Sequence, residues 1–363
     1  MIIGHGGNVE LLARKLGCPS CQIADMSSNL NPLGPPDGFE RFVKDHIRSL
    51  ERLPEADAST LTGTFCKKRD IDPETTLAAN GTTWFIYTLP QAFNSEKVLI
   101  SGPTYSDYHD GCLVRGVSPC FLTAKEEDEF SPDLPHLSKT AGKFDTVFIC
   151  NPNNPTGSLL SRDAVIELVQ RHKNTMFVVD ESYLPFVPGA EKKSLVPLTN
   201  FRNLAVLSSM SKVFTVPGMR IGFLTAHPDT VKKIIPFYQP WSVNSLAQKA
   251  GTYLLETHSD DSPFLLRTRE FIKNQREIFH NKLKTSPRIR LFPSVTSFVL
   301  AGLKGGLTAN HLCERVGRHK ILIRNCSNFA GLGHDRFVRF SLKDSNLNMK
   351  LADIIQSELN HAC

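Results

Sequence analysis

The chain has 363 residues, of which 40% are hydrophobic, which is enough for a sizeable buried core and for two domains. It has no run near the roughly 18 apolar residues of a membrane-spanning helix. Its start also lacks the regions of a secretion signal, so we expect a cytoplasmic protein without membrane association. The net charge of +6 is spread along the chain rather than clustered, and we therefore expect no nucleic-acid binding.

The nine cysteines have irregular spacing, which in a chain without an export signal indicates reduced thiols. Cys18 and Cys21 form the single CxxC pair. A structural zinc site would need a second Cys or His pair at matching spacing. None follows, so we predict no metal site.

The first part of the chain, residues 1–45, is rich in Gly, Asn and Pro and is expected to join the smaller domain while wrapping between the two domains. Beyond it, compact apolar runs without strict alternation predict strands buried on both faces of a mostly parallel sheet. These runs are KVLIS (97–101), TVFIC (146–150), MFVVD (176–180), LAVLSS (204–209) and IGFLTA (221–226). Helices are predicted between them at 83–93 and 161–173, the latter capped by Ser161. Residues 46–245 are therefore predicted to form a large α/β domain.

The pattern changes near residue 245. Long helical stretches are predicted at 245–258 and 263–283, followed by short apolar runs and a last helix. Residues 246–363 are therefore predicted to form a smaller α+β domain.

Four polar motifs fall where strands of the large sheet should end, which is where ligands collect in such sheets. They are Asn80-Gly-Thr-Thr83, Asn151-Pro-Asn-Asn-Pro-Thr-Gly157, Asp180-Glu-Ser-Tyr183 and Ser208-Ser-Met-Ser-Lys212. The first offers amides and hydroxyls at a helix N-terminus, which suits an anion. Hydroxyls at 209 and 211 and the guanidinium at 220 would complete a phosphate site. A phosphate site with a lysine, a carboxylate and a tyrosine meets the needs of pyridoxal 5′-phosphate.

At these motifs the sequence resembles the fold-type I, aspartate-aminotransferase-like enzymes that use pyridoxal phosphate, over essentially the whole chain. The resemblance implies that Lys212 forms the Schiff base with the cofactor and that Asp180 partners its ring nitrogen. The remaining implied contacts are to the ring oxygen (Asn154, Tyr183), to the ring face (Tyr105) and to the phosphate (Gly81, Thr82, Thr83, Ser209, Ser211, Arg220). Beside Arg220 and partly desolvated, Lys212 should have a pKa lowered towards neutrality.

Three further stretches indicate the substrate: Gly4-His-Gly-Gly-Asn8, the run Asp25–Pro36 and the run Ile323–Gly333 with Arg339 beyond it. They resemble the L-threonine-O-3-phosphate decarboxylases of the cobalamin pathway. That family makes (R)-1-amino-2-propanol O-phosphate, and its sites usually lie at a homodimer interface. The resemblance implies that the α-carboxylate is bound by Arg339 with Asn31 and Asn154, and that the substrate phosphate is bound by His5, Gly6, Gly7 and Arg324.

Two departures leave alternatives open. The stretch Arg52-Leu-Pro-Glu-Ala-Asp-Ala58 lacks the tyrosines with which relatives reach the partner's cofactor phosphate, and Thr296-Ser-Phe298 replaces a usual Asn-Phe pair. L-Serine O-phosphate, which would give ethanolamine phosphate, is therefore an alternative substrate. Losing one methyl contact changes discrimination by only about 1–3 kcal/mol. An aminotransferase of the histidinol-phosphate type and a non-catalytic binding module are the other hypotheses.

Overall fold

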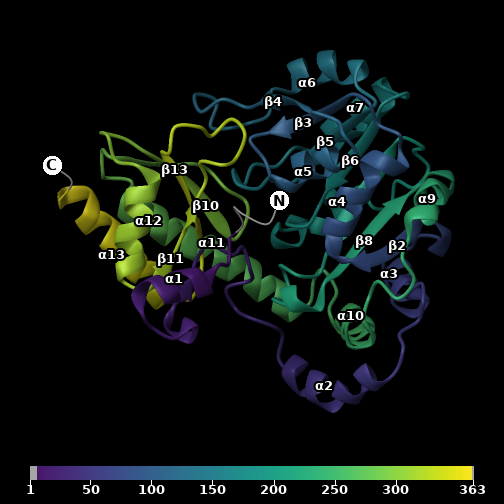
Figure 1. Cartoon of the computed structure of the whole chain (residues 1–363), viewed down its shortest axis with the longest axis horizontal. Helices are drawn as coiled ribbons and strands as arrows, with labels where there is room; N and C mark the ends of the chain where they lie inside the picture. The colour runs from purple at the N-terminus through teal and green to yellow at the C-terminus, as the bar shows by residue number, and fades with distance from the viewer. Residues whose placement is uncertain (1–5, 362–363) are drawn as a thin grey trace.

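A seven-stranded sheet forms the centre of the larger part of the molecule (Figure 1). The computed structural model describes residues 6–361. The strand order is β2-β8-β7-β6-β5-β3-β4. All the strands of this sheet run in one direction except β8, which runs opposite to them. The strands are β2 (Thr76–Asn80), β3 (Val98–Gly102), β4 (Cys120–Thr123), β5 (Thr146–Cys150), β6 (Met176–Asp180), β7 (Leu204–Ser209) and β8 (Ile221–Ala226).

Helices cover both faces of this sheet, which explains why its strands read as continuous apolar runs. One face packs against α3 (Ser59–Arg69), α7 (Arg162–Arg171) and α10 (Ser245–Thr257). The other face packs against α4 (Gly81–Ala92), α5 (Asp107–Val114) and α9 (Pro228–Ile234). Shorter helices complete this part of the chain: α2 (Phe39–Asp45), α6 (Leu134–Thr140) and α8 (Ala190–Lys193).

A smaller antiparallel sheet lies beside the large part, in the order β12-β13-β10-β9 (Figure 1). Its strands are β9 (Ile289–Leu291), β10 (Phe298–Leu303), β12 (Arg324–Asn325) and β13 (Phe337–Ser341). The helices α11 (Pro263–Leu283), α12 (Ala309–Arg318) and α13 (Ser345–His361) accompany it. Near the start of the chain, α1 (Val9–Leu16) leads to β1 (Ala24–Asp25), which pairs in parallel with β11 (Ile321–Leu322). The N-terminal segment is thereby tied to the smaller part.

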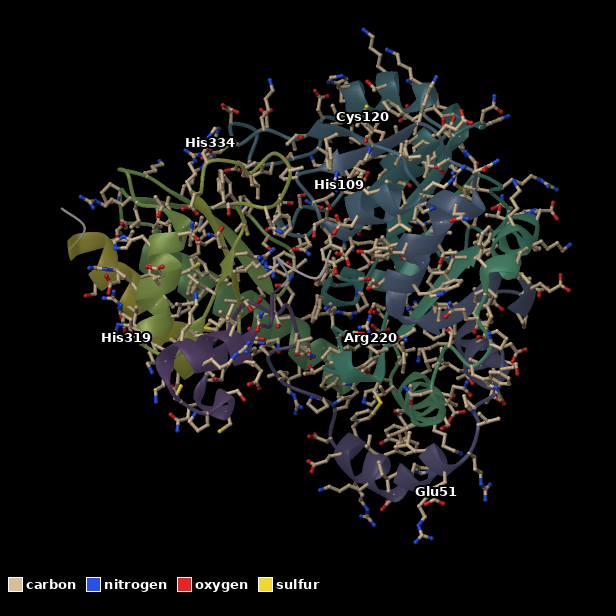
Figure 2. The ribbon with its side chains drawn as sticks, viewed as in Figure 1. Glu51, His109, Cys120, Arg220, His319 and His334 are labelled. Carbon is tan, nitrogen blue, oxygen red and sulfur yellow. The ribbon has the colours of Figure 1, made fainter. Side chains whose placement is uncertain are left out.

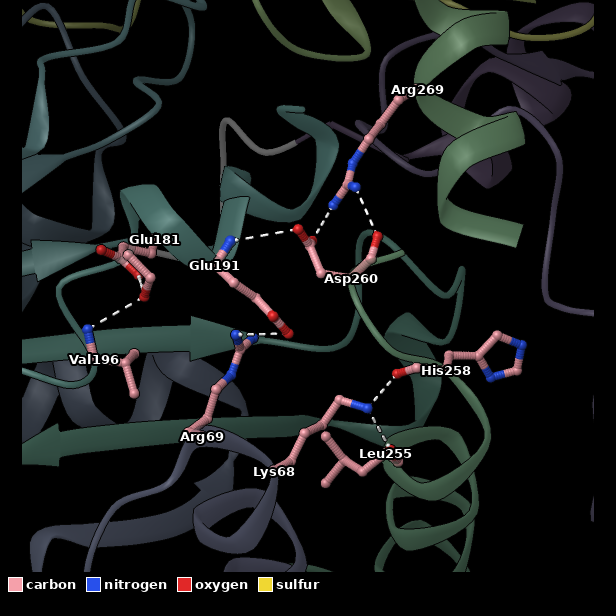
Figure 3. Close-up of polar contacts among 10 residues, drawn as sticks. Lys68, Arg69, Glu181, Glu191, Val196, Leu255, His258, Asp260 and Arg269 are labelled. Carbon is pink, nitrogen blue, oxygen red and sulfur yellow. Dashed lines mark hydrogen bonds and ion pairs between the residues drawn. The ribbon is translucent and has the colours of Figure 1, made fainter. Parts of the chain in front are cut away.

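A buried polar network holds the beginning of α11 against the larger part (Figure 3). Arg269 of α11 donates to the Pro185 carbonyl at 3.0 Å and to the Asp260 carbonyl at 2.7 Å, and it also forms an ion pair with the Asp260 carboxylate. Lys68 of α3 donates to the carbonyls of Leu255, at 2.6 Å, and His258 at the end of α10. Cations at a helix carboxyl end satisfy its free carbonyls. The connection from α10 to α11 is therefore fixed from both sides.

The predicted α/β fold with a mostly parallel sheet is confirmed, and the five predicted strands agree with β3, β5, β6, β7 and β8 to within one residue. The strands β2 and β4 were not predicted, because they lie at the sheet edges and their sequences are not strongly apolar. The predicted domain boundary at 245/246 stays a prediction. In the structure α10, which follows that boundary, packs on α3 and β8 of the large sheet.

Within residues 6–361 no helix combines the length and the apolar character needed to cross a membrane. The same residues contain no group of three or more His, Cys, Asp or Glu side chains that could hold a metal ion.

Gly222 of β8 allows the start of α4 to approach the sheet, and we use it for a prediction on stability. A Cβ at this position would lie 2.3 Å from the amide nitrogen of Thr82 and 2.5 Å from the carbonyl carbon of Gly81. Both are backbone atoms that cannot rotate away, so Gly222→Ala should lower the free energy of unfolding by about 1–3 kcal/mol. Urea denaturation measures this.

The matched control is Gly63→Ala in α3, where a Cβ would meet no atom within 4 Å. Alanine in an open helical position should raise stability, by up to about 1 kcal/mol. Equal destabilisation by the two variants would contradict the close approach at Gly222.

Candidate active site

A cavity of about 240 Å³ lies at the carboxyl ends of β5, β6 and β7, between the large sheet and the smaller one. Its wall brings together fourteen of the residues singled out from the sequence. They are Gly6, Gly81, Thr82, Thr83, Tyr105, Asn154, Asp180, Tyr183, Ser209, Ser211, Lys212, Arg220, Arg324 and Arg339. Residues separated by more than 300 positions in the chain thus share one small space.

One end of the cavity is built for a dianion. The N-terminus of α4 places Gly81, Thr82 and Thr83 in the wall, and helix N-termini attract anions through their free amides. Gly81 has φ of +74°, and a Cβ there would lie only 2.6 Å from the Arg220 guanidinium. Arg220 itself has φ of +55°, a region that non-glycine residues seldom adopt. The backbone thus keeps the guanidinium close against the helix start, where phosphate oxygens could bind both.

At the other side of the cavity floor, Asp180 ends β6 with its side chain buried. Its carboxylate accepts from the Tyr108 hydroxyl at 2.8 Å and from the Ser182 amide at 2.9 Å. Burial raises the pKa of Asp180, and these hydrogen bonds oppose the rise because they stabilise the carboxylate. The carboxylate is therefore fixed in place to meet a protonated ring nitrogen.

The amine of Lys212 lies in the loop after β7, and the pKa of this amine falls to about 8. The largest cause is loss of hydration, followed by the positive charges of Arg339 and Arg220. The predicted lowering towards neutrality is confirmed, with Arg339 as an additional source. An amine of this kind is neutral often enough to attack an aldehyde.

A pair of arginines faces Lys212 from the smaller sheet. Arg324 of β12 and Arg339 of β13 are direct cross-strand partners, so their side chains share one face. Two like charges in this register repel each other, and burial together with the Arg339 charge lowers the pKa of Arg324. Such a pair is stabilised by anions bound between or beside the guanidinium groups.

The two arginines are held differently. Arg339 is buried and donates to the Asn154 side-chain oxygen and, at 2.6 Å, to the Ser27 carbonyl. Its Nε is buried and has no hydrogen-bond partner among the described residues. Arg324 lies over the Phe329 ring at 5.2 Å and donates to Asn328 at 2.7 Å.

Three of the residues chosen from the sequence are not part of the described wall. Asn31 is buried, but its amide donates to the Val213 carbonyl at 2.8 Å and to the Thr268 hydroxyl at 3.0 Å, away from the cavity. The amide of Gly7 donates to the Ser27 hydroxyl at 2.7 Å. His5 lies outside the described residues.

Sequence reasoning missed several wall residues: Ser27, Ser28, Asn29, Ser106, Tyr108, Cys150, Ser182 and Phe329. Most of these residues stand next to a motif that was chosen from the sequence, and this neighbourhood is the feature that could have identified them. Tyr108, for example, stands three residues after Tyr105 and is the second residue of α5, and its hydroxyl reaches Asp180 at the end of β6.

The donor set fits pyridoxal 5′-phosphate, the cofactor expected from the sequence. The α4 N-terminus with Ser209, Ser211 and Arg220 would hold the phosphate, and Asp180 would hold the ring nitrogen. Because the Asn154 oxygen accepts from Arg339, the Asn154 amide nitrogen would be left to donate to the ring oxygen.

The family described as aminotransferase class I and II matches residues 25–355. Among curated proteins, the chain is 32% identical over 356 residues to the adenosylcobalamin biosynthesis bifunctional protein CobDQ of Leptospira interrogans. This match covers 96% of the chain but only 40% of that larger protein. The chain is also 29% identical over 363 residues to the threonine-phosphate decarboxylase of Salmonella typhimurium, covering 98% of the chain and 96% of the relative.

Two solved structures show the same fold. The L-threonine-O-3-phosphate decarboxylase of Porphyromonas gingivalis is 30% identical with a TM-score of 0.81, covering 93% of the chain and 100% of its own. The histidinol-phosphate aminotransferase of Clostridium acetobutylicum is 28% identical with a TM-score of 0.84, covering 93% and 99%. Both activities thus occur on closely similar structures.

The depressed pKa of Lys212 gives a prediction for cofactor addition. We expect the rate at which pyridoxal phosphate adds covalently to the apoenzyme to rise with pH around a midpoint of about 8, since the neutral amine is the nucleophile. Arg339→Gln should move this midpoint upwards, because removing a nearby cation favours the protonated amine. Stopped-flow absorbance measures the rate.

Arg324→Gln is the matched control, since Arg339 and Arg220 are the charges that lower the Lys212 pKa most. We expect its midpoint to stay near that of the unmodified chain. An equal shift in both variants would contradict the assignment of the effect to Arg339.

Proposed function

The chain belongs to the aminotransferase class I and II family, and within it we propose that this protein decarboxylates L-threonine O-3-phosphate to (R)-1-amino-2-propanol O-phosphate in cobalamin biosynthesis. The enzyme depends on pyridoxal phosphate, as the family and the decarboxylase relatives indicate. The observation that carries the proposal is the cross-strand pair Arg324 and Arg339 facing Lys212 across one cavity. Two guanidinium groups suit a substrate with two anionic groups, a carboxylate and a phosphate.

In this proposal Arg339, which lines the cavity, binds the substrate carboxylate. Arg324 and the backbone near Gly6 bind the substrate phosphate, with His5 as a further ligand expected from the sequence. The bound cofactor supplies an electron sink for the bond that breaks at the substrate's Cα. When that bond is the one to the carboxylate, carbon dioxide leaves and a proton must replace it at Cα. Lys212 is the amine placed to deliver it.

An aminotransferase of the histidinol-phosphate type is the alternative function. It is supported by the Clostridium structure, which has the higher TM-score of the two structures above. It would use the same Lys212 to remove the Cα proton rather than to supply one. Which bond breaks would depend on how the substrate is held relative to the bound cofactor. The two arginines that hold the substrate's anionic groups would set that orientation.

Product analysis tests the proposed function. The enzyme loaded with pyridoxal phosphate is incubated separately with L-threonine O-phosphate, L-serine O-phosphate and unphosphorylated L-threonine. We expect carbon dioxide and a phosphorylated amine from the first, a slower or comparable release from the second, and little from the third, because Arg324 would then be left without its anion. Arg324→Gln should raise KM for the phosphorylated substrate more than it lowers kcat.

Absence of carbon dioxide in all three reactions would contradict the decarboxylase. If glutamate then formed from 2-oxoglutarate and histidinol phosphate, the aminotransferase would replace it. Faster reaction of the serine compound would change only the preferred side chain, since the two substrates differ by one methyl.

We also propose that two copies of the chain associate. Leu53 is 78% exposed and Trp241 is 52% exposed. The Trp241 amide donates to the Ala56 carbonyl at 2.8 Å, so the segments that carry these two side chains lie next to each other. Ile47 and Leu50 expose further apolar area on the preceding turn. Arg220, labelled near the centre of the view in Figure 2, is also exposed although it lines the cavity. A second copy would cover both the apolar surface and this side of the cavity.

Leu53→Asp should therefore shift the protein from dimer to monomer, because a carboxylate would be buried at the interface. Sedimentation velocity measures the shift. The control is Val114→Asp, on an apolar side chain that is 67% exposed at the end of α5. A monomeric unmodified protein, or an equal effect of both variants, would contradict the proposed interface.

A further inference from the structure

A chain of buried hydrogen bonds crosses the molecule behind the candidate site. The Ser341 hydroxyl of β13 donates to the side-chain oxygen of Asn29 at 2.7 Å. The side-chain nitrogen of Asn29 in turn donates to the Tyr183 hydroxyl at 3.1 Å. All three residues are at least 94% buried. The relay Ser341–Asn29–Tyr183 thus joins the smaller sheet, the N-terminal segment and the loop after β6.

The relay has a direction because an amide oxygen only accepts and an amide nitrogen only donates. With its oxygen bonded to Ser341, Asn29 presents N–H to the Tyr183 oxygen. The Tyr183 oxygen therefore accepts on this side, and its own proton is left for an acceptor elsewhere. Asn29 and Tyr183 both line the cavity.

The other neighbours of Tyr183 reinforce this direction. Phe298 packs edge-on at 5.1 Å and offers no acceptor for the phenol proton. The positive charge of Arg339 is close enough to act on Tyr183, and it disfavours a proton that points towards it. Burial raises the pKa of Tyr183 to about 12, so the phenol keeps its proton at neutral pH.

We propose that Asn29, held by Ser341, is a positioning residue that orients the Tyr183 hydroxyl to donate its proton to the ring oxygen of bound pyridoxal phosphate. The inference rests on the proposed placement of that oxygen beside Tyr183 and Asn154. A donor at this oxygen stabilises its negative charge. Contact between β13 and the N-terminal segment would therefore tune the cofactor as well as the substrate.

The test is a pH titration of the visible absorbance of the enzyme loaded with pyridoxal phosphate, without substrate. Tyr183→Phe removes the donor and should raise the titration midpoint by about one pH unit, since the negative oxygen loses a hydrogen bond. Asn29→Asp should give a similar rise, because a carboxylate accepts the Tyr183 proton and turns it away from the cavity.

Two uncharged variants separate the effect of the hydrogen-bond relay from the effect of the negative charge that Asn29→Asp introduces. Asn29→Leu is nearly the same size and uncharged, and Ser341→Ala only frees the Asn29 oxygen. We expect both to raise the midpoint by less than Asn29→Asp, since they weaken the preferred direction without reversing it. In the Tyr183→Phe background, Asn29→Leu should add no further shift, because its effect runs through the phenol.

Matched controls account for the general cost of altering buried polar residues. Asn348 is 1% exposed and bonds to Gln275 and to the Lys343 backbone. Ser297 is 0% exposed, and its hydroxyl has no hydrogen-bond partner within residues 6–361. Asn348→Leu and Ser297→Ala should leave the midpoint unchanged. Thermal unfolding of each variant confirms that the compared proteins are folded.

Three results would overturn the proposal: no shift in Tyr183→Phe, no shift in Asn29→Asp, or a full Asn29→Leu shift that persists in the Tyr183→Phe background. An unchanged midpoint in Asn29→Asp would mean that Asn29 already accepts the Tyr183 proton in the unmodified protein. Because no substrate enters the titration, these outcomes are independent of carbon dioxide release. The relay and the decarboxylase activity can therefore fail separately.

Discussion

The concentration of positive charge in one small cavity is the constraint on which the site depends. Lys212, Arg220, Arg324 and Arg339 all line it, and the carboxylate of Asp180 is the negative group that the described wall sets against them. Burying like charges together is costly unless counter-charges arrive. The fold holds the three arginines in place despite this cost: Arg324 and Arg339 lie on paired strands, and Arg220 ends a tight turn before β8. A cofactor phosphate and the proposed doubly anionic substrate would supply the missing negative charge.

The same charges serve the chemistry as well as binding. The positive charges of Arg339 and Arg220 lower the pKa of the Lys212 amine, and Arg339 is the proposed carboxylate ligand. Substrate binding would therefore neutralise part of the positive field that lowers the pKa of Lys212, and this pKa would rise when the substrate is bound. If that carboxylate then left as carbon dioxide, the Arg339 charge would act on Lys212 again, and its ammonium, with the pKa lowered once more, would be the stronger acid when Cα is protonated.

Much of this arrangement could be predicted from the sequence, because the polar motifs follow apolar runs directly. Asp180 after MFVV and Lys212 after LAVLSS must lie at one edge of a parallel sheet once those runs are strands. Asn31 shows where this reasoning stops. It belongs to the same Asn-rich run as Asn29, and only the packing of Thr268 and the Val213 carbonyl decides that Asn31 turns away from the cavity. Such choices depend on contacts between distant segments, which a local pattern does not contain.

The N-terminal segment connects the two parts of the site through such distant contacts. The Asp25 carboxylate accepts from the Ser27 amide at 2.8 Å and from the Ser27 hydroxyl at 2.6 Å, so the turn is held by hydrogen bonds within the segment itself. In this segment the Ser27 carbonyl accepts a hydrogen bond from Arg339, and the Asn29 side-chain nitrogen donates one to the Tyr183 hydroxyl. One short segment thereby fixes a proposed substrate ligand and a proposed cofactor ligand in the same frame. Relative movement of the two sheets would disturb both ligands together, which favours a site that is assembled only when the two parts of the molecule are in register.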